Sequence, residues 1–292
     1  MNIVENQSSI RREQGFDVFV LSNQDVELAV VPELGARIIS LKDLRTKREW
    51  LWHPTSQRNL FRNRAGDRFE SSPLVGLDEC LPTIAPCFWG QRDLPDHGEV
   101  WAAGWTVDGD AWDRGLLRTS VSLKISPFDF VRTIELSENE VRLSYQLKNR
   151  GAVVEDYLWA MHPLLRLQSG DKLELPLSTR ALLNGSDWLD ALNSSGKTGD
   201  CEKTFASPIS DGWAAIRNRE SGDRLHFEWD ATDNNTLGLW LNRGGWHGHH
   251  HFAIEPANGK TDVLTVAAQR KRCGKLAAHG SATWQVCIRV GN

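Results

Sequence analysis

The chain has 292 residues, and its 34 basic and 38 acidic side chains give a net charge of −4 and a pI near 6.1. It contains no basic tract of the kind that binds nucleic acid, and no apolar segment approaches the roughly 20 residues of a membrane-spanning helix. The polar N-terminus has no run that predicts a signal peptide. We therefore expect a cytoplasmic protein that binds neither nucleic acid nor membranes.

The cysteine and tryptophan contents narrow the class of protein further. Five cysteines occur without a CxxC pair, and this odd number argues against a disulfide framework or a zinc knuckle. The 13 tryptophans are typical of a β-sandwich core, and their flat apolar faces also suit stacking on sugar rings. We expect reduced thiols and neither a metal nor another cofactor.

The first third of the chain alternates short strands with turns. Residues 17–31 predict a hairpin whose turn lies at Ser22–Asp25, and residues 36–44 and 49–53 predict two further strands, the second ended by Pro54. Residues 55–75 carry four arginines with little periodicity, which indicates a long basic loop. Residues 76–98 hold too many prolines for a regular element and too many apolar groups for disorder. Ordered irregular chain of this kind often builds functional sites.

From Trp101 the β pattern returns, and it continues to the end of the chain. The alternation of Val141, Leu143, Tyr145 and Leu147 predicts a hairpin across Ser137–Glu140. Residues 180–211 read as a loop with one short helix, and three further strands and a final one follow. These short strands predict an all-β fold, a large antiparallel β-sandwich. Because no linker separates the two halves, we expect residues 1–292 to form one domain.

One stretch near the C-terminus, HGHHHFAIEPANGKTD at residues 247–262, combines a histidine cluster with a carboxylate, Glu255. If residues 247–255 form one strand, His249, His251 and Glu255 share a face, and Pro256 ends the strand. Glu255 would then stand at a strand end, where a rigid scaffold presents it to a ligand as a base. On spacing alone, a solvated or ion-paired glutamate explains the pattern as well.

The same stretch leaves a second chemical interpretation open. An HxH pair with a downstream carboxylate, here His249, His251 and Glu255, has a spacing that suits iron, manganese or zinc in a metal-dependent β-barrel enzyme.

Two more histidines stand in apolar or proline-rich surroundings far upstream. His97 lies in LPDHGEVW and His162 in AMHPLL, and Glu255 lies in AIEPANG. Taken singly, His97 suits a loop and His162 a hydrophobic core. In this order, and together with ELGARIISL, REWLW and the terminal HGSATWQVCIRV, these motifs resemble the aldose 1-epimerase (galactose mutarotase-like) family. The resemblance extends from about Ala29 to Val290.

This resemblance implies a large antiparallel sandwich with a sugar cleft on one sheet and an isomerase that interconverts sugar anomers. It implies that Glu255 removes the proton of the C1 hydroxyl and that His162 protonates the ring oxygen, with His97 bonded at or near that oxygen. Such paired acid and base chemistry is physically reasonable, because opening the hemiacetal needs both proton transfers. A small-molecule sugar is then the expected partner, and the oligomeric state stays unknown.

Contacts to the sugar are assigned less directly. Asp78 or Glu79 in GLDECLP is a candidate for binding hydroxyl groups, since a carboxylate accepts several hydrogen bonds, and Trp240 is the candidate for stacking. Relatives that act on hexose 6-phosphates continue HGFAR, whereas this chain has Trp101 in place of the arginine. The departure favours a neutral sugar, or one whose charge meets the basic loop of residues 58–68. A non-catalytic carbohydrate-binding protein of the same fold is the alternative.

Overall fold

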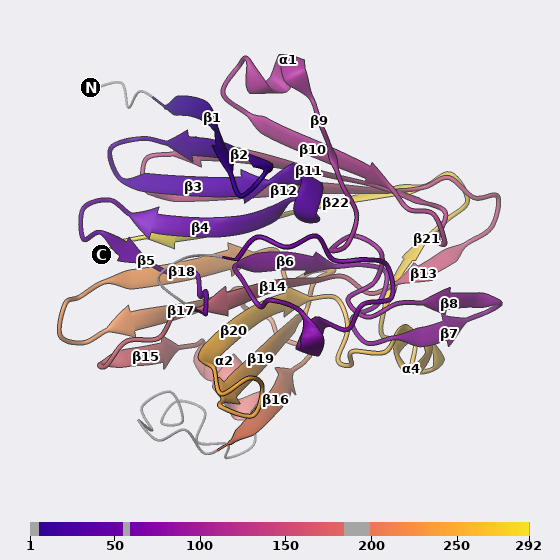
Figure 1. The fold of residues 1–292 in the computed structure, drawn as a ribbon. Helices are drawn as coiled ribbons and strands as arrows, with labels where there is room; N and C mark the ends of the chain where they lie inside the picture. Colours follow the sequence, from indigo (N-terminus) through magenta and orange to yellow (C-terminus); the bar gives the residue numbers. More distant parts are fainter. Residues whose placement is uncertain (1–5, 55–58, 184–198, 292) are drawn as a thin grey trace.

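The computed structural model describes residues 6–54, 59–183 and 199–291, so Arg58 of the predicted basic loop lies outside the described residues. Two large sheets dominate the structure, and paired neighbours within them are antiparallel (Figure 1). The first sheet has the order β1 (Gln7–Glu13), β2 (Phe16–Ser22), β3 (Val26–Val31), β4 (Arg37–Asp43), β6 (Leu77–Cys80), β14 (Ala160–Leu165), β20 (His250–Ala257), β19 (Thr236–Arg243) and β16 (Asp200–Ala206), with β5 (Arg48–Glu49) beside β4.

The second sheet lies behind the first and is built from strands of the middle and end of the chain. Its order is β15 (Asp171–Glu174), β17 (Trp213–Asn218), β18 (Arg224–Trp229), β22 (Ser281–Val290), β12 (Glu140–Asn149), β11 (Phe128–Ser137), β10 (Leu117–Ser122) and β9 (Thr106–Val107). Two small pairs join β13 (Glu155–Tyr157) to β21 (Gly274–Leu276) and β7 (Cys87–Trp89) to β8 (Arg92–Leu94). The helical elements are α1 (Gly109–Trp112), α2 (Leu177–Leu182), α4 (Leu264–Gln269), η1 (Pro32–Leu34) and η2 (Phe69–Ser71).

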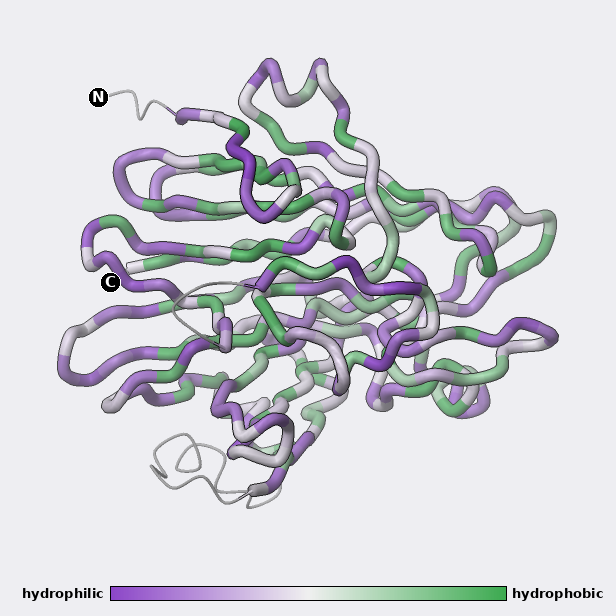
Figure 2. Tube along the Cα trace, viewed as in Figure 1, coloured by the Kyte–Doolittle hydropathy of each residue, from purple (hydrophilic) through white to green (hydrophobic). Residues whose placement is uncertain are grey.

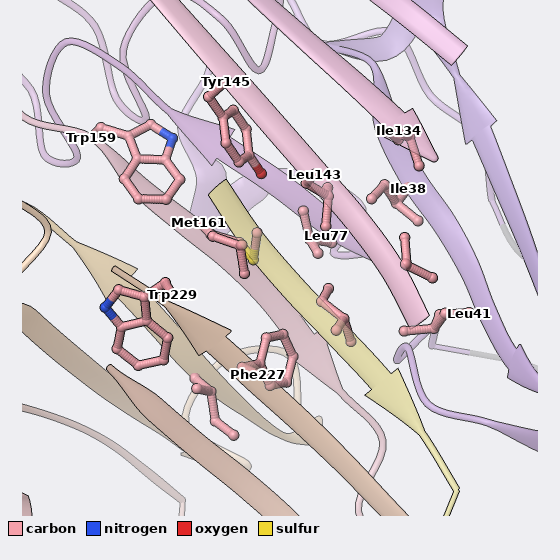
Figure 3. Packing of buried hydrophobic residues seen from close by; sticks show 14 of the residues in the cluster. Ile38, Leu41, Leu77, Ile134, Leu143, Tyr145, Trp159, Met161, Phe227 and Trp229 are labelled. Atoms are coloured by element: carbon pink, nitrogen blue, oxygen red, sulfur yellow. The ribbon is translucent and has the colours of Figure 1, made fainter. Parts of the chain in front are cut away.

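Apolar side chains from the facing surfaces of the two sheets form the main core. Ile38 and Met161 of the first sheet pack among Leu143, Tyr145 and Phe227 of the second, and all of them are almost fully buried (Figure 3). This packing removes apolar surface from water, which is the dominant favourable term in folding. The architecture is the predicted all-β antiparallel sandwich.

Local sequence explains the hairpins. In β12 the alternating burial of residues 141, 143, 145 and 147 matches the period of two predicted for them. β11 and β12 pair with Ser137 opposite Glu140, so the predicted hairpin is confirmed, and Glu138 in its turn has a φ of 53°. The hairpin of β2 and β3, with its turn inside Ser22–Val26, is confirmed as well. Hydrophilic residues concentrate at the ends of the strands (Figure 2).

The middle strands of the first sheet are buried on both faces. Every residue of β14 is buried, and so is every residue of β20 after His250. One face packs on the second sheet, while Trp52, Phe69 and Trp101, from segments that precede β14, cover part of the other face. Because both faces are covered, these strands read as nearly continuous apolar runs rather than as an alternating pattern. The covered outer face contains the candidate site.

The described residues include no helix that is long and apolar enough to cross a membrane.

Candidate active site

A cavity of about 270 Å³ opens on the outer face of the first sheet. Its apolar walls come from Phe69, Trp240 and Trp246, and its polar walls from Asp96, His97, His162, Lys203 and Asp262. A larger hollow of about 590 Å³ lies beside Glu99 and Lys124. We place the candidate site in the smaller cavity because two histidines line it next to a buried carboxylate.

Glu255 and His162 meet beside this cavity because β20 and β14 are neighbours in the sheet. His162 Nε2 lies 3.4 Å from Glu255 Oε1, and both side chains are buried. The pairing of the two strands is interrupted between Ala160, which lies opposite Ala257, and Leu164, which lies opposite Ala253. Pro163 and Pro256 fall in this interval, where their missing N–H groups cannot extend the ladder. The interruption lies where the candidate acid and base face each other.

Glycine makes room for the glutamate. Gly238 of β19 lies opposite Glu255, and a Cβ atom built on it would be 3.0 Å from Glu255 Oε2 and 3.1 Å from its Cβ. Only a residue without a side chain leaves the carboxylate undisturbed at this position.

Lys203 of β16 also reaches Glu255, although β16 pairs with β19 and not with β20. Its Nζ lies 2.8 Å from Glu255 Oε2 and donates a hydrogen bond of 2.7 Å to Asp262 Oδ1. Glu255 itself is fully buried and lies behind Lys203 and His162, which line the cavity. Oε2 of Glu255 therefore faces the Lys203 ammonium, Oε1 faces His162 Nε2, and both oxygens are buried.

His97 enters the cavity from a strained turn. Its φ is 57°, and its Nδ1 lies 2.9 Å from Asp96 Oδ1. Its ring stacks on Phe69 at a centroid distance of 3.9 Å, and Trp101 supports the turn by donating a hydrogen bond of 2.6 Å to the Asp96 carbonyl. Its Nε2 atom is buried and has no hydrogen-bond partner among the described residues. The geometry suits a bond to a ligand.

Burial moves the pKa values of Glu255 and His162 in opposite directions. Complete burial raises the pKa of Glu255 above its ordinary value of 4.5, and the Lys203 ammonium opposes that rise. Burial lowers the pKa of His162 well below its ordinary 6.5, and the nearby His97 and Lys203 act in the same direction. His162 is therefore neutral at pH 7 in the free protein, and any proton placed on it is readily given up.

Trp240 lies in the cavity wall, and its stacking on a sugar stays a prediction. Its ring centroid is 5.6 Å from that of His162 and 4.9 Å from those of Trp246 and His251. Only 5 % of Trp240 is exposed, so a sugar would touch the part of the ring that faces the cavity.

The predicted strand across the histidine cluster is wrong at both ends. β20 begins at His250 and continues through Pro256 to Ala257, while residues 244–249 form a turn in which His247 and Gly248 have positive φ. Glu255 therefore lies inside a central strand and not at its end. The strand stops short because left-handed backbone cannot join a β-ladder.

β20 begins only at His250, so His249, His251 and Glu255 do not share the one face of a strand that the metal-site interpretation requires. His249 lies in the turn, and His251 Nε2 lies 3.2 Å from the side-chain nitrogen of Asn242. The His251 ring is packed between Trp52 and Trp240 at 4.7 and 4.9 Å. Within residues 6–54, 59–183 and 199–291, no three His, Cys, Asp or Glu side chains are placed to hold a metal ion.

Glu79 points away from the cavity, which corrects its expected role as a sugar ligand. It lies between the sheets with no exposed surface, 3.1 Å from Arg132, and accepts hydrogen bonds of 2.8 Å from Tyr145 Oη and 2.9 Å from Trp159 Nε1. Neighbouring residues of a strand face opposite sides of the sheet, so Asp78 lies on the outer face. Arg37 donates a hydrogen bond of 2.7 Å to it, and Asp78 does not line the cavity. Binding of sugar hydroxyls by Asp78 stays a prediction.

The structure adds residues that the sequence patterns did not single out. Lys203 and Asp262 form the charged contact with Glu255, and Phe69 and Trp246 complete the aromatic walls. Lys203 lies in a stretch read as a loop. Only Cys201 and Phe205 are apolar at alternate positions of this strand, and the polar Lys203 between them hides the strand signal.

Comparison with known proteins agrees with this architecture. No family model and no curated protein matches the sequence. Among solved structures, the chain matches a galactose mutarotase-like protein from Clostridium acetobutylicum with a TM-score of 0.72 and 13 % identity, over 99 % of both chains. It matches a provisionally named aldose 1-epimerase from Klebsiella pneumoniae with a TM-score of 0.75 and 16 % identity, over 99 % of this chain and 83 % of that one.

A third match is a galactose mutarotase related enzyme from Lactobacillus acidophilus, with a TM-score of 0.70 and 12 % identity over 94 % of this chain and 97 % of that one. The sequences are only 12–16 % identical, while the arrangement of strands is shared over nearly the whole chain. The protein therefore has the galactose mutarotase-like β-sandwich fold that the order of its motifs predicts.

Proposed function

We propose that the protein is an aldose 1-epimerase-like isomerase that interconverts the anomers of a sugar by acid and base catalysis. One observation carries the proposal: Glu255 and His162, from different parts of the chain, lie 3.4 Å apart at a cavity with aromatic walls. Anomer exchange needs a base and an acid close to each other, and this pair supplies both.

The reaction moves two protons and breaks one bond. Glu255 takes the proton of the C1 hydroxyl, the bond between C1 and the ring oxygen breaks, and His162 gives a proton to that oxygen. The open-chain aldehyde rotates about the bond between C1 and C2. Closure then returns both protons in the reverse direction on the other face. His97 Nε2 forms a hydrogen bond with a sugar hydroxyl near the ring oxygen, and Asp96 holds the imidazole in place.

The charges around the cavity favour a neutral sugar. Lys203 is its one cationic lining residue within the described part of the chain, and Asp96 and Asp262 line it too, with Glu255 behind them. Arg62 of the basic loop pairs with Glu33, and Arg64 lines the separate hollow. A phosphate group would meet carboxylates here instead of the bidentate arginines that it prefers.

A panel of sugars tests the proposal. Exchange between anomers is followed by polarimetry or NMR for neutral aldoses, their 6-phosphates and uronic acids, with and without a chelator. We expect the protein to accelerate exchange for at least one neutral aldose and to leave the charged analogues at the spontaneous rate. Binding without acceleration would favour a carbohydrate-binding protein, and chelator-sensitive turnover would favour metal chemistry.

The pH dependence follows from the lowered pKa of His162. The protonated imidazole becomes rarer as pH rises, so we expect kcat/KM to fall between pH 7 and pH 9 by up to about tenfold per pH unit. The decline should be absent in His162→Gln, which retains only slow exchange. A wild-type rate that is constant across this range would assign the proton donor to another group.

Substitution of Gly238 tests the position of the base. In Gly238→Ala the new methyl group would lie 3.0 Å from Glu255 Oε2 and displace the carboxylate slightly, so we expect kcat/KM to fall by up to about 100-fold, since a small misplacement of a reacting group is costly. Gly109→Ala is the matched control, because a Cβ there has no neighbour within 4 Å. Equal activity of both variants would show that the carboxylate does not need this space.

A further inference from the structure

We infer that Lys203 is a positioning residue for the proposed reaction: its ammonium, held between Glu255 and Asp262, keeps the buried carboxylate of Glu255 ionised and fixed beside the cavity. The inference rests on the proposed role of Glu255 as the base. None of the motifs that carry the family resemblance contains Lys203.

The geometry of the contact is specific. Lys203 lies opposite Trp240 in the register of β16 and β19, and its side chain reaches past β19 to Glu255 on the far neighbour β20. Gly238 leaves space for the carboxylate that Lys203 contacts, because a Cβ atom there would lie 3.0 Å from Glu255 Oε2. The 2.8 Å contact with Glu255 and the 2.7 Å hydrogen bond to Asp262 hold the ammonium from two sides. One cation therefore bridges a buried carboxylate and a half-exposed one.

The need for a cation follows from burial. An ionised carboxylate without solvent is strongly disfavoured, and it takes up a proton unless an opposite charge compensates. A protonated Glu255 cannot accept the proton of a C1 hydroxyl. Among the described residues, Lys203 is the only lysine or arginine that forms an ion pair with Glu255. Lys203 therefore determines how much of the base is ionised.

The other groups around Glu255 have different effects. Lys203 lowers the pKa of Glu255 and so opposes the rise caused by burial. Asp262 raises this pKa and His97 lowers it, and both effects are smaller than that of Lys203. The titratable groups that face Glu255 from the surrounding elements are Lys203 of β16, His162 of β14, His97 of the turn after β8, Cys80 of β6 and Asp262 of the loop after β20. Removing Lys203 and removing the charge of Asp262 should therefore move the pKa of Glu255 in opposite directions.

An ion pair that only fastens the edge strand β16 to the sheet would behave differently. Its loss would lower stability and would still shift the pKa of Glu255, because any cation this close to a carboxylate favours the ionised form, but anomer exchange by the folded variant would be unchanged. The titration shift together with the activity of the folded variants thus separates a positioning role from a purely structural one.

The experiment uses the full chain labelled with ¹³C at glutamate side-chain carboxyls. Comparison with Glu255→Gln assigns the Glu255 signal, which is titrated in wild type, Lys203→Met and Asp262→Asn. We expect the midpoint to rise in Lys203→Met, by about one pH unit or more, and to fall in Asp262→Asn. Asparagine keeps the backbone carbonyl of Asp262, which accepts hydrogen bonds from Ile84 and Ala85.

Kinetics provide the second readout. In Lys203→Met a smaller fraction of Glu255 is ionised, so we expect kcat/KM to fall. The fall should be about tenfold or more at pH 6 and smaller at pH 8, because the missing charge matters most in the pH range where the carboxyl group takes up a proton. Lys203→Arg retains the cation and should recover part of the rate. If Lys203→Met does not fold, Asp262→Asn and Lys203→Arg still decide the matter through the sign of the shift and the recovered activity.

The two proposals fail separately. Midpoints that do not move, or that move in the same direction in Lys203→Met and Asp262→Asn, would overturn the role of Lys203 even if the wild type exchanges anomers. Opposite shifts in a wild type without exchange activity would leave the control of Glu255 by Lys203 standing and would refute the proposed reaction.

Discussion

Glu255→Gln is expected to abolish most of the anomer-exchange activity, with kcat/KM reduced about 10²- to 10⁴-fold. Glutamine keeps the size and shape of the side chain but cannot accept the proton of the C1 hydroxyl. Lys203 retains Asp262 as a charge partner in this variant, so the fold should persist. Polarimetry of a freshly dissolved anomer gives the rate, and near-ultraviolet circular dichroism reports whether the aromatic packing is intact.

Glu202→Gln is the matched control for this loss. Glu202 lies on β16 next to Lys203, its side chain is 48 % exposed, and it forms an ion pair with Arg243. The same chemical change at this exposed glutamate should leave the rate unchanged. An undiminished rate in Glu255→Gln would assign the base to another residue, with Asp262 as the nearest carboxylate that lines the cavity.

Glu79→Ala is expected to lower the free energy of unfolding by about 3–5 kcal/mol, because it leaves the charge of Arg132 buried without its partner. The side chains of Glu79 and Arg132 have no exposed surface, and Tyr145 and Trp159 also donate hydrogen bonds to the carboxylate. Three donors between the sheets would lose an acceptor in a single substitution. Urea denaturation measures the change, with the slope m showing whether the transition stays comparable.

The contrast with an exposed glutamate gives this prediction its control. Glu135 has a side chain that is 50 % exposed and an ion pair of 3.8 Å with Arg142, so Glu135→Ala should cost less than about 1 kcal/mol. Folded Glu79→Ala should still exchange anomers, since the carboxylate does not reach the cavity. A stable Glu79→Ala protein that has lost sugar binding would restore Glu79 as a ligand.

Periodicity and turn residues were enough to predict much of the fold. The hairpin of β11 and β12 follows from alternating apolar residues on both sides of a short polar turn, which is a local signal. The meeting of His97, His162 and Glu255 follows only from the family resemblance, since no local pattern reports that strands more than 90 residues apart are neighbours. The structure brings these three residues together around the cavity.

Three features of the site could not be predicted from the sequence, each for a physical reason. Asp78 and Glu79 are adjacent and chemically alike, and a shift of one residue exchanges the two faces of a strand, so composition does not show which one faces the core. The turn at residues 244–249 depends on left-handed backbone at His247 and Gly248, and histidine gives little sign of this conformation. Lys203 acts through tertiary contacts that cross an intervening strand.

Exchange spectroscopy at anomeric equilibrium tests the central claim most directly. In a two-dimensional NMR experiment on a neutral aldose, cross-peaks between the α- and β-anomeric protons should appear with catalytic amounts of wild-type protein and stay at the spontaneous level with equal amounts of folded Glu255→Gln. Cross-peaks of equal intensity for the two proteins, or none above the spontaneous level for wild type with any neutral aldose, would contradict the assignment of Glu255 as the base of an anomer-exchanging enzyme.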